Sequence, residues 1–247
     1  MRLLIDMGNS RIKWAAAEAH RLSATGAVSH EGEDFITGLQ QKWSGLARPE
    51  AVFIASVVRA ALNGAVSRLV SDLWGLEPVL LSSEAESGAL KNAYRDYREM
   101  GVDRWAAMLA AVNLYPPPLC VIDFGTAVTV DIIDKDKQHR GGYIMPGQGL
   151  AAIMLSKAAH GLSATRPQQY ATEPGLATQE CLANGYATAL VGFVRQAMEQ
   201  AQAITDGEVK LIITGGGAKA ISPLLPMDYI HDKDLVLSGM AYMTHTE

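Results

Sequence analysis

The sequence predicts an α/β protein built from two similar halves, residues 1–116 and 117–247. The first reason is an internal repeat: an apolar run followed by Asp-x-Gly occurs at Asp6–Gly8 and again, about half the chain later, at Asp123–Gly125. The second is that strand-like apolar runs alternate with helical periodicity, which is typical of α/β layers and not of a sandwich. The third is Pro116–Pro118, directly before the second copy, because three prolines continue neither a helix nor an internal strand.

The first half is expected to mix short strands with helices. The clearest helix is 58–74, where Leu62, Val66, Leu69 and Leu73 recur at helical spacing. The expected strands are 2–7, 11–17, 51–57 and 78–82, and the other expected helices are 33–46 and 103–114.

The second half is expected to start with a ladder of hairpins. Its strands are 119–124, 127–133 and 140–145, and the charged connection 134–139 reads as a solvated turn. Helices at 148–160 and 176–204, a strand at 209–214 and a short terminal helix at 235–243 complete the expected order.

Composition and charge exclude several classes of function. The net charge is −5 and the basic residues are scattered, so the chain lacks the Lys/Arg cluster that a nucleic-acid partner requires. The apolar run 105–112 is far shorter than the ~20 residues of a membrane span, and the first residues lack the apolar stretch of a signal peptide. Cys120 and Cys181 form no CxxC motif or disulfide framework, so the expected compartment is the cytoplasm.

The repeated Asp-x-Gly motif has the residue types of a phosphate-binding loop. Glycine two residues after a strand-end aspartate allows a tight turn, whose amides and nearby hydroxyl or amide side chains can donate hydrogen bonds to phosphate oxygens. Asp6 is a candidate ligand for the Mg²⁺ that accompanies ATP, and Lys13 offers a point charge to a phosphate. A single copy would be read as an ordinary hairpin turn; two copies, each after a buried-type strand, favour two phosphate loops that face one cleft.

A third glycine cluster, Gly215–Ala220, also follows an apolar strand. It matches the G-x-G-x-x-A form of the dinucleotide fingerprint, but that fold needs the turn at its first strand with several βαβ units after it. Too little chain follows Ala220 for those units, so a turn on which adenosine lies fits better. A plain strand-to-helix turn remains the alternative, and so it does for Gly141–Gly147.

Asp103, in the segment Gly101–Trp105, has two possible roles. It is well placed as an N-cap of the helix that follows. The same location, at a helix N-terminus and beside Arg104, also keeps a carboxylate ionised and able to accept a proton. HExxH, GxSxG and Walker A motifs are absent from the sequence.

The motifs, and the order in which they occur along the chain, resemble those of the type III pantothenate kinases. This family is also called Bvg accessory factor-like and belongs to the acetate and sugar kinase/Hsp70/actin superfamily. The matching segments are Asp6–Lys13, Gly101–Arg104, Asp123–Ala127, Gly141–Gly147 and Thr214–Gly217. Residues 174–185 resemble the family's Thr-containing substrate segment only loosely.

The resemblance implies ATP-dependent phosphorylation of pantothenate to 4′-phosphopantothenate, the first step of coenzyme A biosynthesis, with Asp103 as general base. It implies two ribonuclease H-like halves of the actin-like ATPase type, each a mixed five-stranded sheet flanked by helices, with the active site in the cleft between them. It also implies a homodimer, Mg²⁺ held by Asp6 through the phosphates, and an activating monovalent cation, K⁺ or NH₄⁺, on Asp123.

The resemblance also assigns residues to the two substrates. Those implied for ATP are Asp6, Met7, Gly8, Asn9, Ser10, Arg11, Ile12, Lys13, Thr126, Gly215 and Gly216. Those implied for pantothenate are Tyr94, Gly101, Val102, Asp103, Arg104 and Thr178. Two alternatives stay open: a catalytically silent regulator on the same scaffold, against which an intact Asp103 argues, and a kinase for another small hydroxyl substrate such as a sugar.

Overall fold

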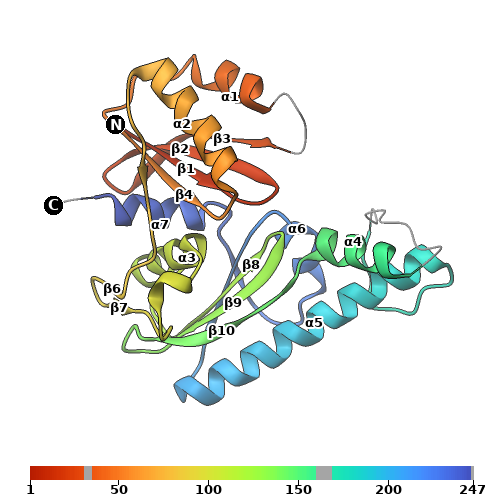
Figure 1. Ribbon diagram of the computed structural model, residues 1–247. Coiled ribbons are helices and arrows are strands. Elements are labelled where there is room, and N and C mark those ends of the chain that lie inside the picture. Colours follow the sequence, from red (N-terminus) through yellow and green to blue (C-terminus); the bar gives the residue numbers. More distant parts are fainter. Residues whose placement is uncertain (31–34, 160–168, 246–247) are drawn as a thin grey trace. The chain divides into compact units, whose positions relative to one another are not determined.

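The computed structural model describes residues 1–30, 35–159 and 169–245 (Figure 1). It confirms the α/β class, with two five-stranded mixed sheets, each flanked by helices. The chain divides into two compact units, which are Met1–Leu114 together with Asp234–Glu247, and Tyr115–Lys233. The expected halves, 1–116 and 117–247, therefore differ from these units mainly at the C-terminal segment, which belongs to the first unit.

The first unit is organised around a central parallel pair of strands. Its sheet has the order β3-β2-β1-β4-β5, in which β1 pairs antiparallel with β2 and parallel with β4. The strands are β1 (Arg2–Met7), β2 (Arg11–Glu18), β3 (Arg21–Ser29), β4 (Ala51–Ser56) and β5 (Val79–Leu80).

Helices α1 (Phe35–Trp43) and α2 (Ala60–Trp74) contribute the apolar core of this unit together with the sheet (Figure 1). Three tryptophans lie in it: the rings of Trp14 and Trp43 meet edge to face with centroids 5.8 Å apart, and those of Trp43 and Trp74 are 5.9 Å apart. Such large buried rings supply much of the apolar area that stabilises a sheet against its helices.

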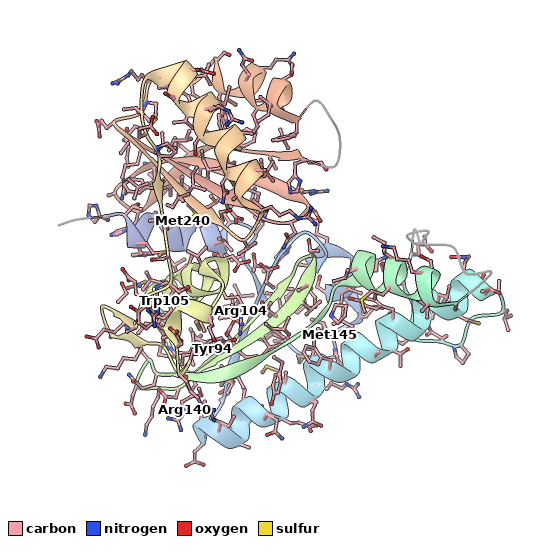
Figure 2. All side chains as sticks on the ribbon, in the orientation of Figure 1. Tyr94, Arg104, Trp105, Arg140, Met145 and Met240 are labelled. Carbon is pink, nitrogen blue, oxygen red and sulfur yellow. The ribbon has the colours of Figure 1, made fainter. Side chains whose placement is uncertain are left out.

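The C-terminal segment joins the first unit because α7 (Leu235–Met243) packs against α3 (Val102–Leu114). Trp105 of α3 and Met240 of α7, both labelled in Figure 2, are fully buried. The two helices approach closely at Gly239, where a Cβ atom would lie only 2.8 Å from Ala106 Cα. A glycine is required at this crossing because no side chain fits between the two backbones.

Gly239→Ala is therefore expected to lower the free energy of unfolding by about 1–3 kcal/mol, because the added methyl group must push the helices apart. The matched control is Gly192→Ala, also within a helix, where a Cβ atom meets nothing within 4 Å. That substitution is expected to stabilise by about 0.4–1 kcal/mol. Urea unfolding of both variants checks the prediction, and equal midpoints would contradict it.

The second unit repeats the sheet arrangement of the first. Its order is β10-β9-β8-β11-β12, with β8 antiparallel to β9 and parallel to β11. The strands are β8 (Leu119–Phe124), β9 (Ala127–Ile133), β10 (His139–Pro146), β11 (Lys210–Thr214) and β12 (Ile230–His231). The helices are α4 (Gln148–Ala158), α5 (Thr178–Thr205) and α6 (Ala218–Ile221), and α5 packs its apolar residues onto one face of the sheet.

Two expectations for the strands of the first unit need correction. Strand β3 was not expected, because its residues, Arg21–Ser29, are mostly small, polar and exposed, as suits an edge strand. The strand expected at 78–82 is only the two-residue β5, at the opposite edge. Residues 33–34 and 160, at the ends of two expected helices, lie outside the described residues.

The connection at 134–139 is a turn, but its last residue is not solvated. Asp134 Oδ1 accepts bonds from the amides of Asp136 and Gln138, both 2.9 Å, which is the usual role of aspartate in a turn. His139 begins β10, is buried, and its Nε2 lies 3.0 Å from Asp131 Oδ1. The sequence pattern missed this pair because it depends on the pairing of β9 with β10.

Both cysteines are free thiols, as expected. Burial in the core of the second unit is the main cause that raises the pKa of the Cys120 thiol to about 12, which leaves this group unreactive. Among the described residues, the helices are too short or too polar to cross a membrane.

Candidate active site

The first predicted phosphate loop is the β1–β2 hairpin. Asp6 lies near the end of β1, is 9% exposed, and faces Lys13 across the antiparallel pair. The turn is closed by the Gly8 amide, which donates to the Arg11 carbonyl oxygen at 3.1 Å. The hairpin thus places an aspartate and a lysine opposite each other at one end of the sheet.

The hairpin presents only some of the predicted ATP residues to solvent. Met7 and Ile12 are completely buried in the core, so only their backbone atoms could meet a ligand. Asn9 and Arg11 are exposed, and Gly8, Ser10 and Lys13 are half-buried. The predicted set is therefore a surface formed by the turn and by Lys13.

The second predicted phosphate loop follows β8 and is surrounded by glycines. Gly215 has a φ of +94°, and a Cβ atom on it would lie 2.6 Å from both N and C of Phe124. A Cβ atom on Gly125 would lie 3.1 Å from Asp123 Oδ1. These glycines leave just enough room for the Asp123 carboxylate at the strand end, which is the kind of close approach that glycine permits.

Backbone hydrogen bonds connect three segments around this loop. The Gly147 amide donates to the Thr126 carbonyl oxygen at 2.9 Å, and the Gly217 amide donates to that of Phe124 at 2.8 Å. The structure thereby brings Asp123, Thr126 and Gly215 together. Gly147 and Gly217 were quoted as motif residues, but their role in holding the loop depends on the tertiary fold.

The N-cap interpretation of Asp103 is wrong. Helix α3 begins at Val102, and the Trp105 amide donates to the Gly101 carbonyl oxygen at 3.1 Å, so Gly101 occupies the cap position. Asp103 lies in the first turn, where the helix dipole stabilises a negative charge. Its Oδ1 accepts a hydrogen bond of 2.8 Å from the Arg104 amide, which fixes the carboxylate near the helix start.

Arg104, the residue after Asp103, forms a pair with Tyr94 (Figure 2). Arg104 is only 7% exposed, its Nη1 donates to Tyr94 Oη at 2.7 Å, and its Cζ lies 5.5 Å from the centre of the Tyr94 ring. Four predicted pantothenate residues, Tyr94, Gly101, Asp103 and Arg104, are therefore neighbours.

Two residues that hold this group were missed from the sequence. Asn92 Oδ1 accepts from the Tyr94 amide at 3.0 Å, while its Nδ2 donates to the Glu84 carbonyl oxygen at 3.2 Å. Buried Ser83 donates from Oγ to the Met100 carbonyl oxygen at 2.9 Å. Side-chain bonds to backbone are what orders a segment with little regular structure, here β6 (Glu86–Ser87), β7 (Leu90–Lys91) and a 3₁₀ turn, Tyr97–Glu99.

The other two predicted pantothenate residues are placed differently. The Val102 side chain is buried, so only its backbone could contact a substrate. Thr178 is exposed at the start of α5 and belongs to the second unit, whereas the Tyr94–Arg104 group belongs to the first.

Comparison with known proteins identifies the family. The family model described as type III pantothenate kinase matches residues 2–200. A type III pantothenate kinase of Alkalilimnicola ehrlichii is 36% identical over 243 residues, covering 98% of this chain and 96% of that relative. The chain belongs to the type III pantothenate kinase family.

Solved structures agree with the fold of this type III pantothenate kinase family member. A protein of Campylobacter jejuni described as a Baf family transcriptional activator has a TM-score of 0.62 at 21% identity, covering 96% of this chain and 94% of that one. The activator of 2-hydroxyisocaproyl-CoA dehydratase from Clostridium difficile, solved with bound ADPNP, has a TM-score of 0.54 at 12% identity, covering 98% and 93%. At these identities the likeness concerns the fold alone, and it agrees with the expected α/β fold.

The carboxylates of this kinase-family chain suit Mg²⁺ that arrives with a nucleotide. Within the described residues, no three His, Cys, Asp or Glu side chains are grouped so that they could hold a metal ion. Mg²⁺ usually keeps several waters and binds through one or two carboxylates plus substrate phosphates, so an all-protein cage is not required. Asp6, near the end of the central strand β1, is the carboxylate that the sequence predicts for this role.

Proposed function

We propose that this protein transfers the γ-phosphoryl group of ATP to the primary hydroxyl of pantothenate, which yields 4′-phosphopantothenate and ADP at the first step of coenzyme A biosynthesis. The observation that carries the proposal is Asp103 in the first turn of α3, beside the buried Arg104–Tyr94 pair, in a chain of the type III pantothenate kinase family. The two free cysteines favour the cytoplasm as the compartment.

The two loops would bind and neutralise the phosphates. Phosphoryl transfer needs positioning and charge neutralisation more than covalent chemistry from the protein. Asp6 would hold Mg²⁺, which supplies positive charge to the phosphate oxygens, and Lys13 would add a further positive charge. The other groups proposed for ATP are the turn Gly8–Ser10, Arg11, Thr126, Gly215 and Gly216, with backbone atoms of Met7 and Ile12.

Asp103 would remove the proton of the acceptor hydroxyl. As the new bond between this oxygen and the γ-phosphorus forms, the bond from phosphorus to the bridging oxygen breaks, ADP departs, and the proton moves to the carboxylate. The Arg104 amide, which binds Oδ1, keeps the carboxylate oriented. The Arg104 guanidinium and the Tyr94 hydroxyl would hold polar groups of pantothenate, with Gly101, Val102 backbone and Thr178 completing the proposed set.

The test is ADP release by the purified protein with ATP and Mg²⁺, with pantothenate compared against a panel of sugars and acetate. Among these acceptors, only pantothenate is expected to sustain turnover. Mass spectrometry should identify the product as 4′-phosphopantothenate. Turnover only with a sugar would identify a different hydroxyl acceptor. A protein that binds ATP and shows no turnover with any acceptor would be a silent scaffold.

We further propose that Asp123 binds an activating monovalent cation. Its carboxylate, set among glycines at the end of β8, would bring negative charge close to the phosphates, and K⁺ or NH₄⁺ would offset that charge. Replacement of K⁺ and NH₄⁺ by choline at constant ionic strength is expected to lower kcat about tenfold or more, or ~1.4 kcal/mol of barrier. Equal rates in potassium chloride and choline chloride, both with Mg²⁺, would disprove the requirement.

We also propose a homodimer that uses α4. This helix has no buried residue, and Met154 is 53% and Ile144 of the adjoining β10 is 62% exposed. A helix that exposes large apolar side chains usually meets a partner surface. Met154→Glu is expected to shift the mass in sedimentation equilibrium from dimer to monomer, and Gln202→Glu, which adds the same charge at another exposed position, should leave it unchanged. A monomeric wild type would refute the proposal.

A further inference from the structure

The Gly8 and Ser10 carbonyl groups of the β1–β2 turn point to the end of β3, the strand that was not expected from the sequence. His30, directly after β3, lies with its Nε2 2.8 Å from the Gly8 carbonyl oxygen. Two further bonds reach the Ser10 carbonyl oxygen, one of 3.4 Å from the His30 amide and one of 3.3 Å from Ser29 Oγ. Both carbonyl groups at the ends of the turn are therefore held on the β3 side.

The imidazole must be the donor in its bond to Gly8. A carbonyl oxygen only accepts hydrogen bonds, so Nε2 carries a proton. This condition is met by the neutral Nε2–H tautomer and by the imidazolium alike. Phe35 meets the imidazole edge on, with ring centroids 6.3 Å apart, which helps to hold its orientation.

This bond also determines where the Asn9 amide points. A peptide group is planar and trans, so its C=O and N–H bonds point in opposite directions. With the Gly8 carbonyl turned to His30, the N–H of Asn9 faces away from β3. A turn that binds phosphate has to present N–H groups to the anion, because a carbonyl oxygen there would repel it.

We propose that His30 is a positioning residue for the phosphate-binding turn. Its hydrogen bond holds the Gly8 carbonyl group away from the nucleotide, and the Asn9 N–H group therefore points toward the nucleotide. This inference rests on the proposed function, since it takes the ligand of the turn to be the phosphates of ATP. His30 makes no contact with the reacting atoms in this role. It acts through the backbone of the turn.

The experiment compares His30→Leu, which removes the donor, with His30→Gln, whose side-chain amide can still donate to Gly8. Calorimetry would give Kd for Mg–ATP and for adenosine, and kinetics would give KM for pantothenate. His30→Leu is expected to weaken Mg–ATP binding about threefold to tenfold, the usual effect of one lost hydrogen bond, while Kd for adenosine stays unchanged. His30→Gln is expected to restore most of the affinity, and KM for pantothenate should be that of the wild type in both variants.

The matched control is His231→Leu, the same change at an exposed histidine of β12, which should bind both ligands like the wild type. The proposal is overturned if His30→Leu binds Mg–ATP normally, if Mg–ATP and adenosine are weakened equally, or if His30→Gln fails to restore binding. Because nucleotide binding is measured without an acceptor, a wild type that binds Mg–ATP and does not phosphorylate pantothenate would refute the proposed function and leave this test intact. A wild type that binds no ATP would refute both.

Discussion

Asp103→Asn is expected to lower kcat for pantothenate phosphorylation by about 10²–10⁴, which corresponds to ~3–5 kcal/mol of barrier. Asparagine keeps the shape of the side chain and an oxygen for the Arg104 amide, but it cannot take up the proton of the hydroxyl. A loose transition state needs less help from a base, which places the loss toward the lower end.

The position of Asp103 makes this substitution a clean test. Since Gly101 is the N-cap and Asp103 lies in the first turn, the change loses only the attraction between the carboxylate and the helix dipole, about 0.3–1 kcal/mol of stability. The melting temperature and Kd for ATP should therefore stay close to the wild-type values. Asp72→Asn, at an exposed position of α2, is the matched control and should keep full activity. A folded Asp103→Asn variant within threefold of the wild-type kcat would exclude the general-base role.

Gly215→Ala is expected to lower kcat/KM for ATP about 100-fold, because a displacement of about 1 Å in a positioning loop can cost that much. The new Cβ atom would lie 2.6 Å from the backbone of Phe124, and a φ of +94° is strained for alanine. Overpacking of this kind also costs about 1–3 kcal/mol of stability. The loop that carries Asp123 and Thr126 must shift as a result.

The neighbouring glycine provides the stability control for this prediction. A Cβ atom on Gly216 meets nothing within 4 Å, so Gly216→Ala is expected to keep the wild-type melting temperature. Steady-state kinetics with varied ATP, together with thermal unfolding, would be measured for both variants. If Gly215→Ala matched Gly216→Ala in melting temperature and the wild type in kcat/KM for ATP, the close packing around Asp123 would have no functional role.

Most of the regular elements and the candidate motifs follow from local sequence. Strands at 2–7, 119–124 and 127–133 were predicted with the bounds that the structure has, because continuous apolar runs between turn residues specify buried strands. The ordered glycine and aspartate motifs were also sufficient to indicate the family. The assignment of individual residues to ATP and pantothenate stays a prediction.

Within the described residues, an edge strand, a histidine contact and a helix cap could not be predicted from the sequence. Each depends on the tertiary structure and not on the local sequence pattern. Edge strand β3 has a weak pattern of its own and is defined by its pairing with β2. His30 meets Gly8 only because that pairing carries the end of β3 back to the β1–β2 turn. The cap at Gly101, which displaced Asp103 from that role, depends on where α3 begins.

The sequence by itself thus determined the α/β class, the similarity of two halves and the motifs at the ends of β1, β8 and β11, since each follows from local apolar runs and turn residues. Tertiary structure alone decided which unit receives the C-terminal helix, because the approach of Gly239 to Ala106 joins segments separated by more than half the chain. It also decided how the polar groups near the candidate site are oriented. A buried arginine and a turn carbonyl must find hydrogen-bond partners wherever the fold supplies them, and here it supplies Tyr94 and His30.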